Sequence, residues 1–229
     1  MSLMVIEGLD GSGKSTQIQN IKDYFTEMGI PFRFLHFPRL NESLYGELIA
    51  RFLRGELGGI DQVNPYLVAT LYAADRADFK PTLAEWLKGP DIVFLDRYVY
   101  SNIAYQCAKT KNRKESDELR EWILNLEYSY YGLPKPDISI FLDVPFEFTC
   151  KNLTSVRSGK DREYLGNNRD IHEDDLDFQE KVRMTYLLQE GEPGFVKLSC
   201  ATDDGTDILS PDIIFNRITE ILKTNHLIP

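Results

Sequence analysis

The sequence predicts an α/β domain with a five-stranded parallel sheet and helices on both of its faces. Five short apolar runs, rich in β-branched and aromatic residues, alternate with amphipathic helical segments along the 229 residues. No linker, internal repeat or low-complexity stretch interrupts this alternation. We therefore expect a single domain over residues 1–229, with right-handed crossovers between its parallel strands.

The expected strands are residues 3–6, 31–37, 92–95, 138–142 and 195–198. The expected helices are residues 14–28, 43–53, 64–87, 101–111, 116–131, 145–156 and 173–189, with a last helix beginning at residue 210. Asn64-Pro65 and Ser210-Pro211 each combine a capping side chain with a proline suited to the first helical position. Residues 158–171 are polar and charged and break the periodicity, so we expect a lid over about 157–171.

The composition restricts the class of partner. The formal net charge is −10, from 36 acidic and 26 basic residues, which argues against a nucleic-acid or anionic-membrane surface. The three cysteines are far apart and are expected to be free thiols. No apolar stretch approaches the roughly 20 residues needed to span a bilayer, and no signal peptide is visible. We expect a cytoplasmic protein without nucleic-acid or membrane partners.

A phosphate-binding loop follows the first strand. The pattern G-x-x-x-x-G-K-[ST] is met by residues 8–15, between a predicted strand and a predicted helix, which disfavours a chance glycine turn. Lys14 is expected to be exposed to the β- and γ-phosphates of ATP, and the Ser15 hydroxyl to bind Mg²⁺. The expected ATP-binding residues are Gly8, Leu9, Asp10, Gly11, Ser12, Gly13, Lys14, Ser15 and Thr16.

The loop alone does not choose among nucleotide-binding classes. The sequence contains no N-K-x-D string typical of regulatory GTPases and no L-S-G-G-Q string typical of transporter ATPases. The remaining class is mainly the small-molecule kinases, which use ATP with Mg²⁺. Their acceptor site must come from the rest of the chain.

Charged residues follow the second and third strands, where the carboxyl ends of a parallel sheet form a ligand crevice. Asp96 can hold Mg²⁺ through water, and Arg97 and Arg39 can bind phosphates. Alternatively, Asp96 and Arg97 form only an ion pair at the start of a helix. Three residues one helical turn later can contact a base or a sugar: Ser101, Asn102 and Tyr105.

The long helix after Pro65 carries a third group of candidates. Tyr72 and Arg76 lie on one helical face at i and i+4, with Asp75 beside them. The alternative interpretation is a solvated charged face next to a core aromatic side chain. An acidic protein that binds ATP needs local positive charge, which we expect from Lys14, Arg39, Arg76, Arg97 and the lid arginines.

Together these motifs resemble those of the thymidylate kinase family. The resemblance extends from residue 4 to about residue 190 and is carried by residues 8–16, 37–39, 71–76, 96–105 and 132–137. It implies a P-loop fold, ATP and dTMP as substrates, dTDP and ADP as products, Mg²⁺ as cofactor and a homodimer.

The resemblance also implies roles for individual residues. Asp10 would contact the deoxyribose 3′-hydroxyl or the metal. Arg39 and Arg97 would hold the dTMP phosphate, with Arg97 bridging toward the transferred γ-phosphoryl group. In the base pocket, Tyr72 would stack on thymine where the family commonly has Phe, Arg76 and Asn102 would read the base edge, Tyr105 would stand near C2′, and Phe37 would border the base.

Family members supply catalytic charge either from an arginine in the loop or from basic lid residues. Gly11-Ser12 lacks the arginine, so the chain resembles the second type. Its basic lid residues are Arg157, Lys160, Arg162 and Arg169. Arg162 is the first candidate for the catalytic group, beside Lys14, Arg97 and Asp10, and Arg157 is the alternative. His172 is given no role, because several members have an aromatic residue there.

Two other functions remain open at this stage. Another nucleoside monophosphate or deoxynucleoside kinase would share the architecture, and a deoxynucleoside kinase would need a carboxylate base, for which Glu7 is available. A nucleotide-binding regulatory module without transfer activity is the third possibility.

Overall fold

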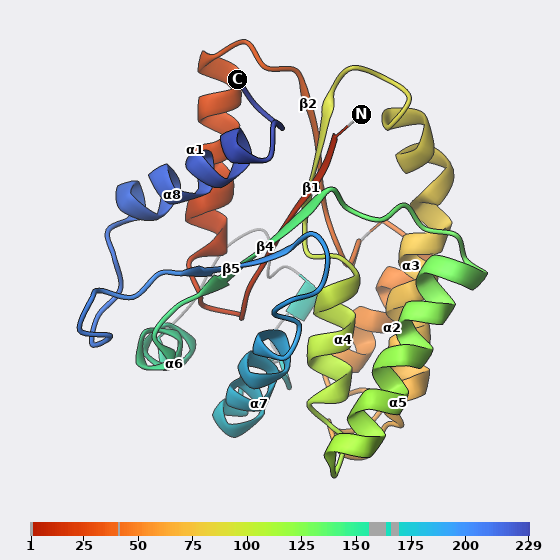
Figure 1. The fold of residues 1–229 in the computed structure, drawn as a ribbon. Helices are drawn as coiled ribbons and strands as arrows, with labels where there is room; N and C mark the ends of the chain where they lie inside the picture. Colours follow the sequence, from red (N-terminus) through yellow and green to blue (C-terminus); the bar gives the residue numbers. More distant parts are fainter. Residues whose placement is uncertain (1, 41, 156–163, 166–169) are drawn as a thin grey trace.

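The computed structural model describes residues 2–40, 42–155, 164–165 and 170–229. Its centre is a parallel sheet of five strands in the order β2-β3-β1-β4-β5 (Figure 1). The strands are β1 (Ser2–Glu7), β2 (Phe32–His36), β3 (Ile92–Asp96), β4 (Ile138–Asp143) and β5 (Phe195–Ser199). All four pairings are parallel, so the predicted strands and fold class are confirmed.

Helices cover both faces of this sheet. They are α1 (Lys14–Glu27), α2 (Leu44–Leu53), α3 (Pro65–Trp86), α4 (Val99–Cys107), α5 (Arg113–Leu124), the π-helical turn η1 (Asn125–Tyr130), α6 (Phe146–Thr154), α7 (Leu176–Leu187) and α8 (Pro211–Thr224). Figure 1 shows α1 and α8 on one side of the sheet and α3, α4 and α5 on the other. Among the described helices, none combines the length and the apolar composition that a membrane-spanning segment requires.

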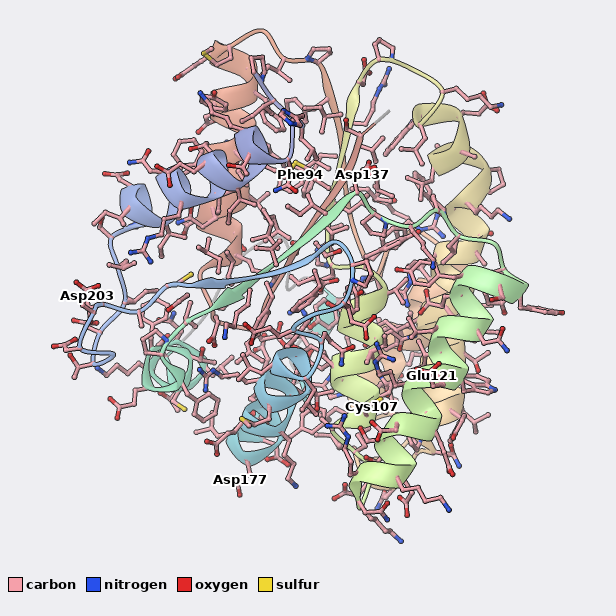
Figure 2. All side chains as sticks on the ribbon, in the orientation of Figure 1. Phe94, Cys107, Glu121, Asp137, Asp177 and Asp203 are labelled. Atoms are coloured by element: carbon pink, nitrogen blue, oxygen red, sulfur yellow. The ribbon has the colours of Figure 1, made fainter. Side chains whose placement is uncertain are left out.

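Each central strand contributes to two hydrophobic cores, because successive strand side chains point to opposite faces. On β1, Leu3 and Val5 face the core shared with α3, α4, α5 and α7. Met4 and Ile6 face the other core, with Phe94 and the apolar stripes of α1 and α8. Figure 2 shows Phe94 between the sheet and this second helical layer. The central strands β1, β3 and β4 are therefore buried on both sides, which explains their largely continuous apolar sequence.

Some helix boundaries differ from the predicted ones. α5 begins at Arg113 rather than at residue 116, because the Asn112 side chain caps it by accepting from the Glu115 N–H. α7 begins at Leu176 rather than at residue 173, because Asp175 caps it in the same way. The predicted helix 116–131 divides into α5 and η1.

Candidate active site

A cleft of about 890 Å³ lies at the carboxyl edge of the sheet. The predicted residues that line it are Asp10, Gly11, Ser12, Gly13, Lys14, Ser15, Phe37, Arg39, Tyr72, Arg76, Asp96, Arg97, Ser101, Asn102 and Tyr105. Gly8, Leu9 and Thr16 are not among the lining residues. Arg157, Lys160, Arg162 and Arg169 lie outside the described residues. Four separate segments of the sequence thus meet in one cavity, as expected at this edge of a parallel sheet.

The phosphate loop needs glycine for its backbone geometry. Gly11 and Gly13 have φ angles of 74° and 83°, a region that other L-residues rarely adopt. The first backbone N–H groups of α1, those of Lys14 and Ser15, have no acceptor within the described part of the chain. Unpaired N–H groups and the positive end of the helix dipole favour an anion at this position.

Lys14 lies along the loop. Its side chain is only 9% exposed, and its Nζ atom is 3.4 Å from the Leu9 carbonyl, so it is less exposed than predicted. Burial, reinforced by the positive charge of Arg97, lowers the pKa of Lys14. A bound phosphate would supply the negative charge that this ammonium group needs.

Asp96 and Ser15 fit the requirements of a Mg²⁺ site. Asp96 Oδ2 accepts from the His36 ring nitrogen at 2.8 Å, whereas Oδ1 is buried and has no hydrogen-bond partner among the described residues. Burial raises the pKa of Asp96, but His36 and Lys14 outweigh it and bring the pKa to about 2. The result is an ionised oxygen donor, the ligand type that Mg²⁺ prefers.

Arg97 is the centre of the polar network in the cleft. Its guanidinium donates to Asp10 at 2.7 Å, to the Ser101 hydroxyl at 3.2 Å and to the Tyr105 hydroxyl at 3.3 Å. The backbone of Arg97 has a φ angle of 66°, which is unusual for a residue with a side chain. Because Arg97 reaches across to Asp10 rather than pairing with Asp96, the interpretation as a local ion pair at a helix start is wrong.

Asp10 is held ionised by this network. Burial would raise its pKa, yet the charges of Arg97 and Lys14, together with the hydrogen bond from Tyr105, hold the pKa well below its usual range. The Tyr105 hydroxyl donates to Asp10 at 2.6 Å. Gln179, which the sequence patterns did not indicate, donates to the same oxygen at 3.3 Å. Asp10 is therefore a fixed hydrogen-bond acceptor at the point where the phosphate loop meets Arg97 and Tyr105.

Arg39 reaches the cleft from the loop after β2 but is itself paired. It donates through Nε and Nη2 to Asp75, and through Nη2 to Asp78 at 2.7 Å. Asp75 is fully buried and Arg76 is 2% exposed, so the interpretation of this part of α3 as a solvated face is wrong. Each of the three described cleft arginines has a carboxylate partner. The positive charge expected in the cleft is therefore largely compensated within the described residues.

Gly46 of α2 allows close contact with the segment that carries Arg39. A Cβ atom at Gly46 would lie 1.9 Å from the Arg39 carbonyl oxygen and 2.7 Å from its carbon. Because both atoms are backbone, Gly46→Ala should displace α2 and lower the free energy of unfolding by about 2–4 kcal/mol. Chemical denaturation would measure this.

The control for that substitution is Gly59→Ala. Like Gly46, Gly59 is outside the left-handed region, but an added Cβ atom would meet nothing closer than the Gln62 Oε1 atom at 3.9 Å. We expect a change of less than about 1 kcal/mol there. Equal stability of Gly46→Ala and the unchanged protein would contradict the close contact.

Described residues inside the expected lid range, and one residue directly after it, also line the cleft. His172, given no role, lines the cleft and packs against Tyr105 and Phe178 at ring distances of 5.2 and 5.1 Å. Burial and the nearby Lys109 hold the pKa of His172 well below its usual range, so the ring is neutral. The neutral His172 ring packs among aromatic side chains as an aromatic residue would.

Asp170 and Tyr164 also line the cleft. The Tyr164 hydroxyl donates to Asp170 at 2.5 Å. Burial, reinforced by the negative charge of Asp10, raises the pKa of Asp170 to about 7. The available signal for Asp170 was its place inside the polar segment 158–171, close to the predicted helix that begins at residue 173.

Glu7 does not take part in the lining of the cleft. It is fully buried, where it accepts from the Tyr98 N–H at 3.0 Å, from the Ser101 hydroxyl at 2.5 Å and from the Tyr186 hydroxyl at 3.0 Å. Burial raises the pKa of Glu7. Its hydrogen bonds connect β1 with α4 and α7, so Glu7 stabilises the packing of these elements.

Comparisons with known proteins agree on one family. A family model described as thymidylate kinase matches residues 6–201. Thymidylate kinases from two strains of Mycobacterium tuberculosis are each 35% identical over 185 residues, which cover 80% of this chain and 83% of theirs. A probable thymidylate kinase from Pyrococcus abyssi is 33% identical over 186 residues, covering 80% of each chain.

A solved structure leads to the same family. The structure of thymidylate kinase from Candida albicans superposes with a TM-score of 0.71 at 26% identity, covering 98% of this chain and 92% of that one. The family match spans the phosphate loop, the cleft and most of the sheet, and the predicted P-loop fold is confirmed. On its sequence, its fold and the residues gathered in its cleft, the chain belongs to the thymidylate kinase family.

Proposed function

We propose that this chain transfers the γ-phosphoryl group of ATP to dTMP, giving ADP and dTDP. One observation carries the proposal: the phosphate loop and the predicted base-reading residues open into the same cleft. The hydrogen bond between Arg97 and Asp10, 2.7 Å long, connects the phosphate loop with the part of the cleft that carries the base-reading residues. A donor phosphate on the loop and an acceptor phosphate beside Arg97 would thus be neighbours.

The chain's own residues act by positioning and by charge. The acceptor oxygen of dTMP is already ionised at neutral pH, so transfer needs no general base. The loop N–H groups and Lys14 hold the donor phosphates, and Arg97 stabilises the charge between donor and acceptor. Asp10 orients Arg97 and offers an acceptor to a sugar hydroxyl.

Mg²⁺ is the proposed cofactor, held by Asp96 through water and by the Ser15 hydroxyl. When bound, the ion neutralises charge on the phosphate oxygens. The described residues contain no cluster of three or more His, Cys, Asp or Glu side chains suited to a metal. This agrees with Mg²⁺, which commonly takes few protein ligands and completes its shell with water and phosphates.

Arg162, in the proposed lid over about 157–171, is proposed to complete the charge around the transferred group. Because the three described arginines of the cleft already have carboxylate partners, Arg162→Ala should lower kcat about a hundredfold and change the KM for dTMP by less than about threefold. Steady-state kinetics with Lys151→Ala on α6 as control would measure this. An unchanged kcat would assign the role to another basic lid residue, Arg157 first.

A deoxynucleoside kinase is disfavoured by the position of Glu7. Phosphorylation of a sugar hydroxyl needs a base within hydrogen-bond reach, and both Glu7 oxygens are occupied away from the cleft. The test compares dTMP with thymidine as acceptor. Transfer to thymidine alone would overturn the proposal, and ADP formation independent of any acceptor would indicate a different activity.

We further propose that the chain works as a single domain, as a homodimer and in the cytoplasm. Four large hydrophobic side chains on α2 and α3 are exposed in the isolated chain: Leu44, Tyr45, Leu48 and Leu67. Apolar groups gathered on a helical surface favour association with another protein surface. A second copy of the chain is the partner that the family resemblance implies.

A further inference from the structure

The π-helical turn η1 carries a carboxylate at a core position. Leu119, Ile123 and Glu127 follow one another at intervals of four residues, and all three are fully buried. The first two belong to the apolar face of α5, and Glu127 continues that face where it packs against α3 and α4. π-helical turns are rare and frequently occur at functional sites. A buried carboxylate at such a turn needs hydrogen-bond donors, and the donors to Glu127 indicate its role.

Glu127 binds both residues that are predicted to read the base. Arg76 donates through Nε to Oε2 at 2.5 Å and through Nη2 to Oε1 at 2.6 Å. Asn102 donates through Nδ2 to the same Oε1 at 2.8 Å. Within the described part of the chain, these two bonds of Arg76 leave its Nη1 atom unused. One carboxylate therefore fixes an arginine from α3 and an amide from α4.

The orientation of the Asn102 amide follows from chemistry. Its Nδ2 faces two groups that only accept, the Glu127 carboxylate and the Ala69 carbonyl at 3.0 Å. Turning the amide over would bring Oδ1 against both acceptors, so the NH₂ group must point toward them. Oδ1 is then directed the other way; it is buried and has no partner among the residues that the structure describes.

Arg76 and Asn102 both line the cleft. Arg76 provides a hydrogen-bond donor there, and the unpaired Oδ1 atom of Asn102 provides an acceptor beside it. A pyrimidine with an N3–H and a C4 carbonyl matches this pair, with N3–H donating to Oδ1 and O4 accepting from Arg76. A 4-aminopyrimidine presents the reverse pattern, a lone pair at N3 and an NH₂ group at C4. It would place acceptor against acceptor and donor against donor.

We propose that Glu127 is a positioning residue that sets base selectivity by fixing the polarity of the Asn102 amide. The inference rests on the proposed function and goes beyond it, because Glu127 is not among the residues that line the cleft. Without a carboxylate at this position, only the Ala69 carbonyl still favours this orientation, so the Asn102 amide turns over more readily and offers Nδ2 to the base. Discrimination against 4-aminopyrimidine monophosphates would then weaken.

The test measures kcat/KM for dTMP and for dCMP in Glu127→Gln. The Gln side chain keeps the shape but can present an NH₂ group to Asn102, so the ratio of the two constants should fall at least about tenfold. The KM for dTMP should rise, while the KM for ATP should stay within about twofold and kcat within about threefold. The control is Glu121→Gln on the exposed face of α5, labelled in Figure 2, which should change none of these values.

A second variant covers the case in which Glu127→Gln does not fold, because it removes the charge partner of buried Arg76. Glu127→Asp keeps the charge but withdraws both oxygens by one methylene, and should lower the same ratio by at least about threefold. A ratio equal to that of the unchanged protein in a folded variant overturns the role of Glu127. Equal losses for dTMP, dCMP and ATP would also overturn it, since they would indicate a structural role alone. If the unchanged protein does not phosphorylate dTMP, the proposed function itself fails.

Discussion

Lys14→Ala should lower kcat by about a thousandfold and leave the fold intact. The Lys14 ammonium lies on the phosphate loop at the start of α1, 3.4 Å from the Leu9 carbonyl, and no other described lysine lies on this loop. Removing it takes away the positive charge nearest to the donor phosphates. The phosphate-binding N–H groups of the loop remain, so ATP binding should weaken less than turnover.

The measurement is kcat under saturating ATP and dTMP, together with a thermal unfolding curve. Lys88→Ala is the matched control, because the Lys88 side chain is 70% exposed and forms a surface pair with Glu85. A folded Lys14→Ala protein with near-normal turnover would refute the assigned role of Lys14.

Arg97→Lys should lower kcat/KM for dTMP by about a hundredfold or more, although it conserves the charge. The Arg97 guanidinium binds Asp10 through Nη2 and the Ser101 hydroxyl through Nη1 at the same time. A single ammonium group cannot span both partners and still meet a phosphate. Arg and Lys pay the same free-energy cost for a backbone φ angle of 66°. The substitution therefore tests the two-pronged guanidinium group and not the backbone.

Arg33→Lys is the control for Arg97→Lys. Arg33 pairs with Asp91 at the surface, with a side chain that is 55% exposed, and its replacement should change activity by less than about threefold. If Arg97→Lys keeps activity to the same degree, positive charge alone would suffice and the proposed bridging geometry would be wrong.

Local patterns explain why much of the fold could be predicted. The buried strands appear as continuous apolar runs, and the phosphate loop depends on glycines and Lys14 within eight consecutive residues. Asn64-Pro65 opened α3 where expected, and its side chain caps the Tyr66 N–H. The helix starts that were predicted wrongly depend on the less conspicuous caps Asn112 and Asp175.

Partners that are far apart in the sequence explain what could not be predicted. Glu127 lies 51 residues from Arg76 and meets it only when η1 packs against α3. A carboxylate at the apolar spacing of Leu119 and Ile123 was the available signal. The compensation of Arg39 by Asp75 and Asp78 likewise depends on the approach of the segment after β2 to α3. Sequence spacing identified the charged residues but not which of them neutralise one another.

The central claim is that one cleft holds a donor phosphate on the loop and an acceptor phosphate beside Arg97. Its most direct test follows the label from ATP labelled at the γ-phosphate during a single turnover with excess enzyme and dTMP. We predict that the label appears in dTDP at the same rate and in the same amount as ADP forms. Release of the label as inorganic phosphate, at a rate unaffected by dTMP, would contradict the claim.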